Sequence, residues 1–202
     1  MARAQQSVDA IVKQIVAEAA QEVPNSTGEN GESPMGQLIA DAQRAALGAD
    51  VALMNPGGIR WGLSAGRITW GDVFTVHPFG NRIMRVELSG ASLLALLNQQ
   101  WHGAYPGRLL AVSGLTYSWD ARGAPGERIV DVQIGGTALD TSRTYTVAVN
   151  DFMLSGGDGL AQLKQAANPV AGPLDRDALI TYLRALPQPI RLTPTLRIRR
   201  VE

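Results

Sequence analysis

The sequence contains no cysteine and only two histidines among its 202 residues. The absence of cysteine excludes a disulfide framework, a thiolate metal site and a cysteine nucleophile. His77 and His102 lie far apart, and neither has a second histidine at helical spacing to complete a metal-binding pair. We therefore expect no catalytic or metal-ligating residues here, because a two-metal hydrolytic centre draws on several imidazoles and carboxylates.

An excess of charge of one sign is also missing, since 18 Lys and Arg residues balance 18 Asp and Glu residues. The sequence lacks the basic footprint by which proteins bind a phosphate backbone, so we expect no nucleic-acid partner. No apolar run reaches the ~18 residues that cross a bilayer, and no signal peptide is recognisable at the N-terminus. The length and the 45% hydrophobic content fit one globular domain of generous size or at most two small ones.

The N-terminal part of the sequence is predicted to be a helix that ends at Pro24. Apolar residues recur through residues 7–23 at the spacing of one helical face. The following residues 25–33 have no apolar side chain and are rich in turn formers, which indicates a loop or a linker. We therefore predict a linker helix and loop over residues 1–30 and a main domain over residues 31–202.

The main domain is predicted to have an α+β fold. Ser33 and Pro34 are suited to begin a helix that ends at Gly48, and further helices are expected after Ser89 and over residues 175–186. Short apolar or alternating runs predict strands over residues 50–54, 68–70, 73–76, 81–88, 115–119, 130–134, 145–149 and 196–201. Strands outnumber helices without regular alternation, which favours a mixed sheet with helices packed on it over a doubly wound sheet.

Three loops carry the chemical information. Residues 55–60 place two adjacent glycines and Arg60 after a strand, which suits either backbone contact with a phosphate or sugar ligand or a simple tight turn. Residues 77–81 hold Phe79 between proline and glycine, where its ring either offers a platform for a planar base or packs into the core. Residues 150–159 combine Phe152 with Asp158, whose carboxylate either accepts hydrogen bonds from sugar hydroxyls or caps the next helix.

Five blocks occur in one order along the chain: residues 36–42, 55–60, 68–76, 78–81 and 150–159. Together they resemble the C-terminal domain of the 5′-nucleotidase family, which includes periplasmic UDP-sugar hydrolases and 2′,3′-cyclic-nucleotide phosphodiesterases. The resemblance implies a nucleotide-binding domain in which Phe79 and Phe152 hold the base between their rings. It further implies that Asp158 holds the ribose hydroxyls and that Arg60 faces the ribose and phosphate.

The substrate-binding residues implied by the resemblance are Asn55, Gly57, Gly58, Arg60, Phe79, Asn81, Gly103, Phe152 and Asp158. Asn55 and Asn81 would contact the base or nearby polar atoms, and Gly103 would lie in a loop that borders the pocket. Family members with a strong phosphate clamp carry arginines before residue 36, where this chain is acidic and has none. With Arg60 alone, phosphate is expected to add only ~1 kcal/mol to binding, unless Arg82 or Arg108 on neighbouring loops also reach it.

The family's N-terminal metallophosphoesterase domain, which holds two divalent metals, is absent from this sequence. The resemblance therefore implies a periplasmic or extracellular phosphohydrolase whose nucleotide-recognition half is this chain, and whose metals and hydrolysis belong to the other half of the same polypeptide. We expect the chain alone to bind and not to cleave, and to need no cofactor of its own. The alternatives are a domain of a cyclic-nucleotide phosphodiesterase or of a UDP-sugar hydrolase, and a non-catalytic nucleoside-binding module.

Overall fold

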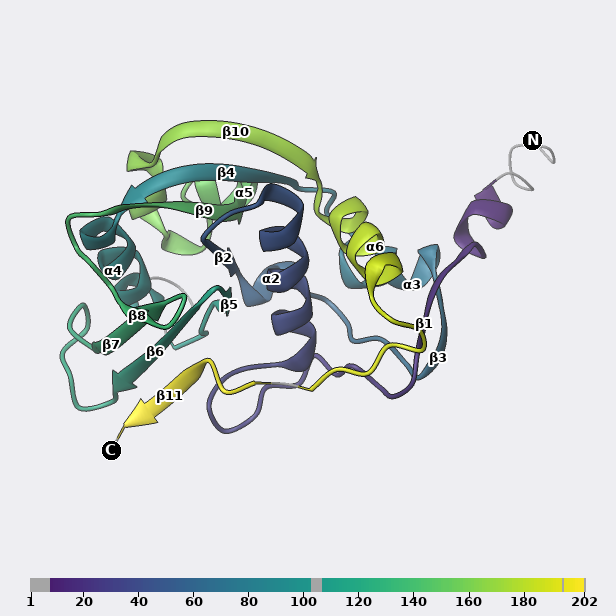
Figure 1. Cartoon of the computed structure of the whole chain (residues 1–202), viewed down its shortest axis with the longest axis horizontal. Helices are drawn as coiled ribbons and strands as arrows, with labels where there is room; N and C mark the ends of the chain where they lie inside the picture. The colour runs from purple at the N-terminus through teal and green to yellow at the C-terminus, as the bar shows by residue number, and fades with distance from the viewer. Residues whose placement is uncertain (1–7, 103–106, 194, 202) are drawn as a thin grey trace.

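Strands in three sheets and the helices around them make up the structure (Figure 1). The computed structural model describes residues 8–102, 107–193 and 195–201. The strands are β1 (Ile15–Ala19), β2 (Val51–Met54), β3 (Gly66–Thr69), β4 (Arg82–Ser89), β5 (Ala111–Ser113), β6 (Leu115–Asp120), β7 (Ile129–Ile134), β8 (Thr137–Ala138), β9 (Thr144–Asn150), β10 (Ala167–Leu174) and β11 (Ile198–Val201). The α-helices are α2 (Pro34–Leu47), α3 (Trp70–Val76), α4 (Gly90–Asn98), α5 (Asp151–Leu154) and α6 (Asp175–Ala185), and short 3-10 turns are η1 (Pro56–Gly58), η2 (Gln99–Trp101), η3 (Gly157–Gly159) and η4 (Ala161–Gln165).

The central sheet has five strands in the order β10-β4-β9-β2-β5. Strands β2 and β9 run parallel, with Val51 opposite Val147, while β4 runs antiparallel to β9, with Ile83 opposite Asn150. The ends of β2 and β9 and the beginning of β4 therefore lie at one edge of the sheet. A four-stranded sheet, β11-β6-β7-β8, and a two-stranded sheet, β1-β3, lie on either side of it (Figure 1). The predicted α+β class with a mixed sheet is confirmed.

Two hydrophobic cores cover the two faces of the central sheet. Val51 and Leu53 of β2 pack into the core shared with α4 and the four-stranded sheet. Met54, the next residue, points the other way and packs with α2, α3, α6 and β1. This division follows from the alternation of side chains along a strand. No helix among the described residues is long and apolar enough to span a bilayer.

The predicted helix over residues 7–23 is wrong beyond residue 12. Residues 8–12 are helical, residue 7 lies outside the described part of the chain, and β1 begins at Ile15 and pairs antiparallel with β3. Val16 and Ala17 are buried in the core that also contains Leu179 of α6. Pairing with β3 and burial against α6 thus override a periodicity that also fitted a helix. The division of the chain at residue 30 stays a prediction, although residues 15–23 pack with the main domain.

The predicted strand over residues 73–76 is also wrong, because these residues belong to α3. The side chain of Thr69 accepts a hydrogen bond from the backbone of Asp72, and the Asp72 carboxylate accepts one from the backbone of Thr69. This reciprocal capping box starts the helix directly after β3. The predicted helices that begin after Ser33 and after Ser89 are confirmed, with both serines acting as N-caps.

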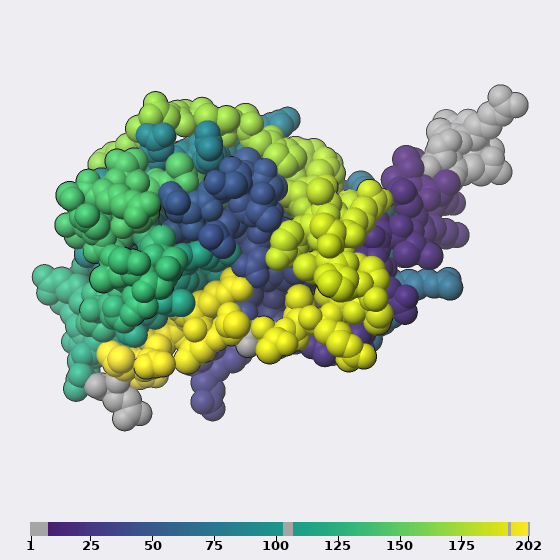
Figure 2. All heavy atoms as spheres, in the orientation of Figure 1, coloured from purple at the N-terminus to yellow at the C-terminus, as the bar shows by residue number. Residues whose placement is uncertain are grey.

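The C-terminal segment, yellow in Figure 2, lies beside the blue atoms of α2. A buried carboxylate, that of Glu32, attaches β11 to the N-terminal end of α2. Glu32 Oε2 accepts hydrogen bonds from the backbone nitrogens of Arg197 and Ile198 at 3.0 and 3.1 Å. Its other oxygen accepts from Gln37 Nε2 at 2.8 Å. The Arg197 guanidinium also forms a bidentate pair with Asp41 of α2, with both distances at 2.8 Å.

We expect Glu32→Ala to lower the free energy of unfolding by about 2–3 kcal/mol, because it removes the acceptor of two backbone N–H groups and of the Asn30 and Gln37 side-chain amides. Glu29→Ala is the matched control, since Glu29 is exposed three residues earlier. Urea unfolding followed by circular dichroism measures both variants. Equal stabilities for the two variants would contradict the role of Glu32.

A buried pair, His77 and Asp175, lies under the loop that precedes β4. Both side chains are fully buried, and His77 Nδ1 lies 3.7 Å from Asp175 Oδ2. Burial lowers the pKa of His77 to about 4, an effect partly offset by a weak contact with the Gly58 backbone that falls short of a full hydrogen bond. Burial likewise raises the pKa of Asp175 to about 6. The Asp175 backbone also donates a 2.8 Å hydrogen bond to the carbonyl of Asn81, which attaches α6 to the C-terminal end of this loop.

His77 and Asp175 change the stability of the fold in opposite directions as pH rises. Between pH 4 and 6.5 the unfolded chain protonates His77 and the folded chain does not, so this group stabilises the fold as pH rises. Between pH 3.8 and 6 the folded chain keeps the proton on Asp175 and the unfolded chain loses it, so this group destabilises the fold as pH rises. We therefore expect Asp175→Asn to make the free energy of unfolding rise more steeply with pH than in the wild type. We expect His77→Gln to make it fall with pH. Each variant should change the slope by up to about 1.4 kcal/mol per pH unit relative to wild type.

Thermal or urea unfolding at pH 4, 5, 6 and 7 measures these slopes. His102→Gln is the control, because it makes the same substitution at the other histidine, which is exposed. Parallel pH profiles for Asp175→Asn and His77→Gln would show that the pair does not titrate in this way.

Candidate functional site

A cavity of about 270 Å³ opens where three loops meet at the edge of the central sheet. The loops are residues 55–60 after β2, residues 77–81 before β4 and residues 150–159 after β9. The cavity is lined by Asn55, Gly57, Gly58, Arg60, Phe79, Asn81, Arg108, Phe152 and Asp158. Eight of the nine residues predicted from the sequence therefore line one cavity. The ninth, Gly103, lies outside the described residues.

The two phenylalanine rings lie at the surface of the cavity and not in the core. Phe79 is 56% exposed and Phe152 is 44% exposed. The alternative that these rings pack into the interior is therefore wrong. Their exposure leaves apolar ring surface available inside a cavity that also contains polar groups, an arrangement typical of small-molecule sites.

Each ring is held by a neighbouring group. The guanidinium carbon of Arg60 lies 5.7 Å from the centre of the Phe79 ring, within the range of a cation–π interaction. The backbone of Gly157 lies against the Phe152 ring so closely that a Cβ at residue 157 would come within 2.5 Å of it. Gly157 therefore allows the 150–159 loop to support the ring, a role that the sequence alone did not assign.

Asp158 is presented by a strained turn. Its backbone has a φ of 55°, in the left-handed region, between Gly156 and Gly159 with φ values of 91° and 81°. Aspartate tolerates this conformation better than most residues, and such backbone conformations concentrate at functional sites. The carboxylate makes no cap to the following turn η4. Instead its Oδ2 accepts a 2.7 Å hydrogen bond from Nδ2 of the buried Asn55, so the helix-cap alternative is wrong.

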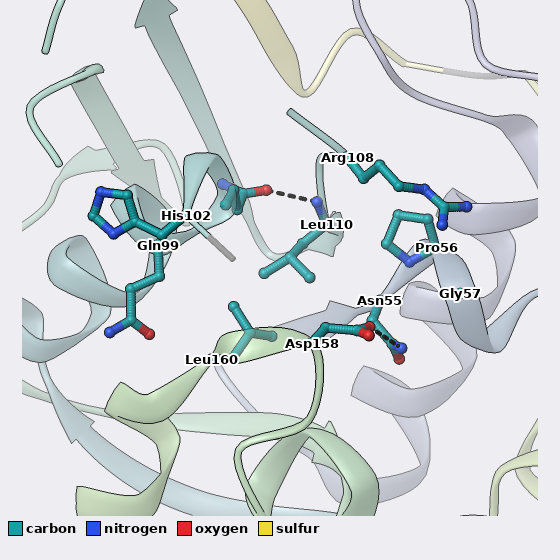
Figure 3. A pocket seen from close by; sticks show the side chains of 10 residues that line it. Asn55, Pro56, Gly57, Gln99, His102, Arg108, Leu110, Asp158 and Leu160 are labelled. Atoms are coloured by element: carbon teal, nitrogen blue, oxygen red, sulfur yellow. Dashed lines mark hydrogen bonds between the residues drawn. The ribbon is translucent and has the colours of Figure 1, made fainter. Parts of the chain in front are cut away.

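Two arginines lie on the wall of the cavity. Arg60 and Arg108 are both exposed, and Arg108 also lines two hollows that adjoin the cavity. Figure 3 shows the smaller hollow, where Arg108 lies near Pro56 and where Asp158 and Asn55 are hydrogen-bonded. Arg82, in contrast, donates to the carbonyl of Gly172 and does not line the cavity. The motifs assigned only Arg60 to the site, because Arg108 lies outside the five blocks.

The described residues contain no group of three or more His, Asp or Glu side chains that could hold a metal ion. His77 is buried and does not line the cavity. The cavity therefore offers aromatic surface, one carboxylate, amides and two guanidinium groups. These groups can bind a flat ring, hydroxyls and an anion, whereas none of them is arranged with a second group as a nucleophile and its base.

Comparison with known proteins gives a match to the family model described as "5'-nucleotidase, C-terminal domain" over residues 12–165. The chain is 37% identical over 195 residues to Endonuclease YhcR from Bacillus subtilis, covering 95% of the chain and 16% of that protein. It is 32% identical over 159 residues to Protein UshA from Escherichia coli, covering 76% of the chain and 27% of UshA.

Among solved structures, a 5′-nucleotidase precursor from Thermus thermophilus superposes with a TM-score of 0.85 at 34% identity, covering 97% of this chain and 41% of that one. The NAD nucleotidase NadN from Haemophilus influenzae shares the fold with a TM-score of 0.79 at 19% identity. The chain spans less than half the length of each of these relatives. The extent of the family match and these identities show that the chain belongs to the 5′-nucleotidase family and corresponds to the C-terminal domain of its members.

Proposed function

We propose that this chain is the nucleotide-recognition domain of a 5′-nucleotidase-type phosphohydrolase and that it binds the nucleobase between Phe79 and Phe152. One observation supports this proposal above the others. Two exposed phenylalanine rings, from loops far apart in the sequence, line a single cavity with a carboxylate and two arginines. The cavity volume of about 270 Å³ is near the lower end of the range for small-molecule sites.

Each part of a nucleotide has a matching group in this cavity. Aromatic faces bind a base by stacking, which tolerates different bases because each has a π-face. The carboxylate of Asp158 accepts hydrogen bonds and suits the ribose hydroxyls. Arg60 and Arg108 offer planar donors for the phosphate. Asn81 and the glycines Gly57 and Gly58 complete the wall and supply polar atoms near the ligand.

In the whole protein, binding here would place the phosphoryl group at a two-metal centre on a preceding metallophosphoesterase domain. Base stacking would then serve orientation, while the metals activate water and stabilise the developing charge. We propose that the whole protein is a phosphohydrolase that acts in the periplasm or outside the cell, in keeping with its family. The alternatives, a cyclic-nucleotide phosphodiesterase and a UDP-sugar hydrolase, also act on ligands that carry a base, so base stacking in this cavity is compatible with all three.

We expect Phe79→Ala and Phe152→Ala each to weaken the binding of adenosine monophosphate by about 1–3 kcal/mol, the cost of one base–aromatic stack. Uridine monophosphate serves as a second probe, because stacking does not depend on a particular base. Phe74→Ala is the matched control, since Phe74 is exposed and lies outside the cavity.

Calorimetric titration measures the affinities, and circular dichroism checks the fold. Wild-type protein that binds neither nucleotide would contradict the proposed function. Unchanged affinity in both cavity variants would contradict the base sandwich alone.

The position of Arg108 changes the expectation for the phosphate. Two exposed arginine contacts should each add about 0.5–1 kcal/mol, so the monophosphate should bind about 5- to 30-fold more tightly than the nucleoside. Arg60→Ala and Arg108→Ala should each remove part of this difference without affecting the nucleoside, and added salt should reduce it.

Arg82→Ala is the control, because Arg82 lies outside the cavity. The same titrations with nucleoside and monophosphate at low and high salt decide the question. A difference that survives in Arg108→Ala at its full wild-type size would exclude Arg108 from phosphate binding.

A further inference from the structure

Asn150 is a buried residue that does not line the cavity but lies behind it, at the end of β9. Its Oδ1 accepts a 2.8 Å hydrogen bond from the backbone N–H of Met153, at the start of α5. A backbone N–H can only donate, so this contact fixes which end of the Asn150 amide is oxygen. Its nitrogen must therefore point the other way, where it donates to Asn55 Oδ1 at 2.9 Å.

The orientation of Asn150 determines that of Asn55. Since Asn55 Oδ1 receives the hydrogen bond from Asn150, Asn55 Nδ2 is the end that faces the carboxylate of Asp158, at 2.7 Å. The reversed Asn55 amide would set two nitrogens against each other on one side and two oxygens on the other. Asn55 is 3% exposed and Asn150 is fully buried, so water offers little compensation for a reversed amide.

The chain of hydrogen bonds from Asn150 through Asn55 ends at Asp158, where it occupies one of the two carboxylate oxygens. Oδ2 accepts from Asn55, whereas Oδ1 has no hydrogen bond within the part of the chain that the structure describes. Asp158 is exposed and lines the cavity, so this second oxygen remains an acceptor for a ligand hydroxyl. A carboxylate held by a buried donor is preorganised and loses less entropy when it binds.

We propose that Asn150 is a positioning residue that acts through Asn55 to orient Asp158 for the hydroxyls of a ribose. This inference rests on the proposed function. It explains why the cavity would prefer a ligand that carries ribose hydroxyls. A purely structural role, as the N-cap of α5 that carries Phe152, would predict a different result. Loss of the cap would weaken every stacked ligand equally, whereas loss of orientation would weaken only ligands with hydroxyls.

Asn150→Asp separates the two roles. The aspartate keeps an oxygen for the Met153 N–H and remains a good N-cap, but it cannot donate to Asn55. Asn55 would then turn its nitrogen towards residue 150 and its oxygen towards Asp158, where two acceptors repel. We expect wild-type protein to prefer a ribonucleoside over its 2′,3′-dideoxy analogue by about 10-fold or more, and Asn150→Asp to reduce the preference to within about 2-fold.

The control is Asn98→Asp, the same change at another buried asparagine. The Asn98 side chain accepts from the backbone of Arg128 and Ile129 and donates to the carbonyl of Leu94, and it does not line the cavity. It should keep the wild-type preference. In an Asp158→Ala background, Asn150→Asp should cause no further loss of preference, because the group through which it acts is gone.

A second measurement does not require Asn150→Asp to fold or a ligand to bind. In nuclear magnetic resonance spectra of the wild-type chain and of Asp158→Ala, the side-chain amide signals of Asn55 and Asn150 should both shift, while those of Asn98 should not. An unchanged Asn150 signal would overturn the coupling. If the wild type binds neither adenosine nor uridine, the proposed function fails while this coupling is still tested. If it binds one of them and folded Asn150→Asp keeps the full preference, the inference fails and the proposed function stands.

Discussion

The parallel pairing of β2 with β9 is the constraint on which the site depends. Two parallel neighbours end at the same edge of a sheet, so the segments that follow Met54 and Asn150 start side by side although they are far apart in sequence. Strand β4 runs antiparallel to β9 and begins at that edge, which brings in the loop that carries Phe79. The hydrogen bonds of the sheet therefore fix where the three loops meet, and loop residues decide what the cavity contains.

Buried polar groups then hold these loops in place from below. Asn150 and Asn55 connect the loops after β9 and β2, and α6 holds the loop before β4 through the Asp175 backbone. Such groups are costly to bury unless they are paired, and the His77 and Asp175 side chains pair only at 3.7 Å. The cost of burying these two side chains is therefore only partly offset, while the Asp175 backbone holds Asn81, two residues after Phe79.

The sequence predicted most of the elements whose local signals agreed with their tertiary contacts. Helix α2 has Ser33 as N-cap and Gly48 in the left-handed conformation at its end, so both its bounds could be predicted. The errors occurred where a local pattern fitted two structures: residues 15–19 have apolar spacing that suits a helix, but they pair with β3. Strand β10 was missed because two prolines and a glycine conceal it, and it is tolerated only as the edge of the central sheet.

The same limit applies to the site. The family blocks predicted its lining residues, but they did not indicate Arg108, whose place on the wall depends on the path of the chain after α4. Nor did the role of Asn150 follow from its position in a block, because only the structure shows which atoms of three side chains meet. Motifs specify which residue types surround a ligand, whereas the direction of each hydrogen bond follows from backbone donors that sequence reasoning cannot place.

The acidic residues before α2 show that charges counted in the sequence do not give the charge that is available near the cavity. Residues 26–32 include two glutamates and no arginine, which suggested a poor environment for phosphate. In the structure Glu32 accepts hydrogen bonds from Asn30, from Gln37 and from two backbone N–H groups of the C-terminal segment, so its charge is balanced by internal donors. Arg108 lines the same hollow as Glu32 and extends the wall of the main cavity. Arg60 and Arg108 are thus the charged donors that line the cavity, while Glu32 of the acidic run attaches β11 to α2.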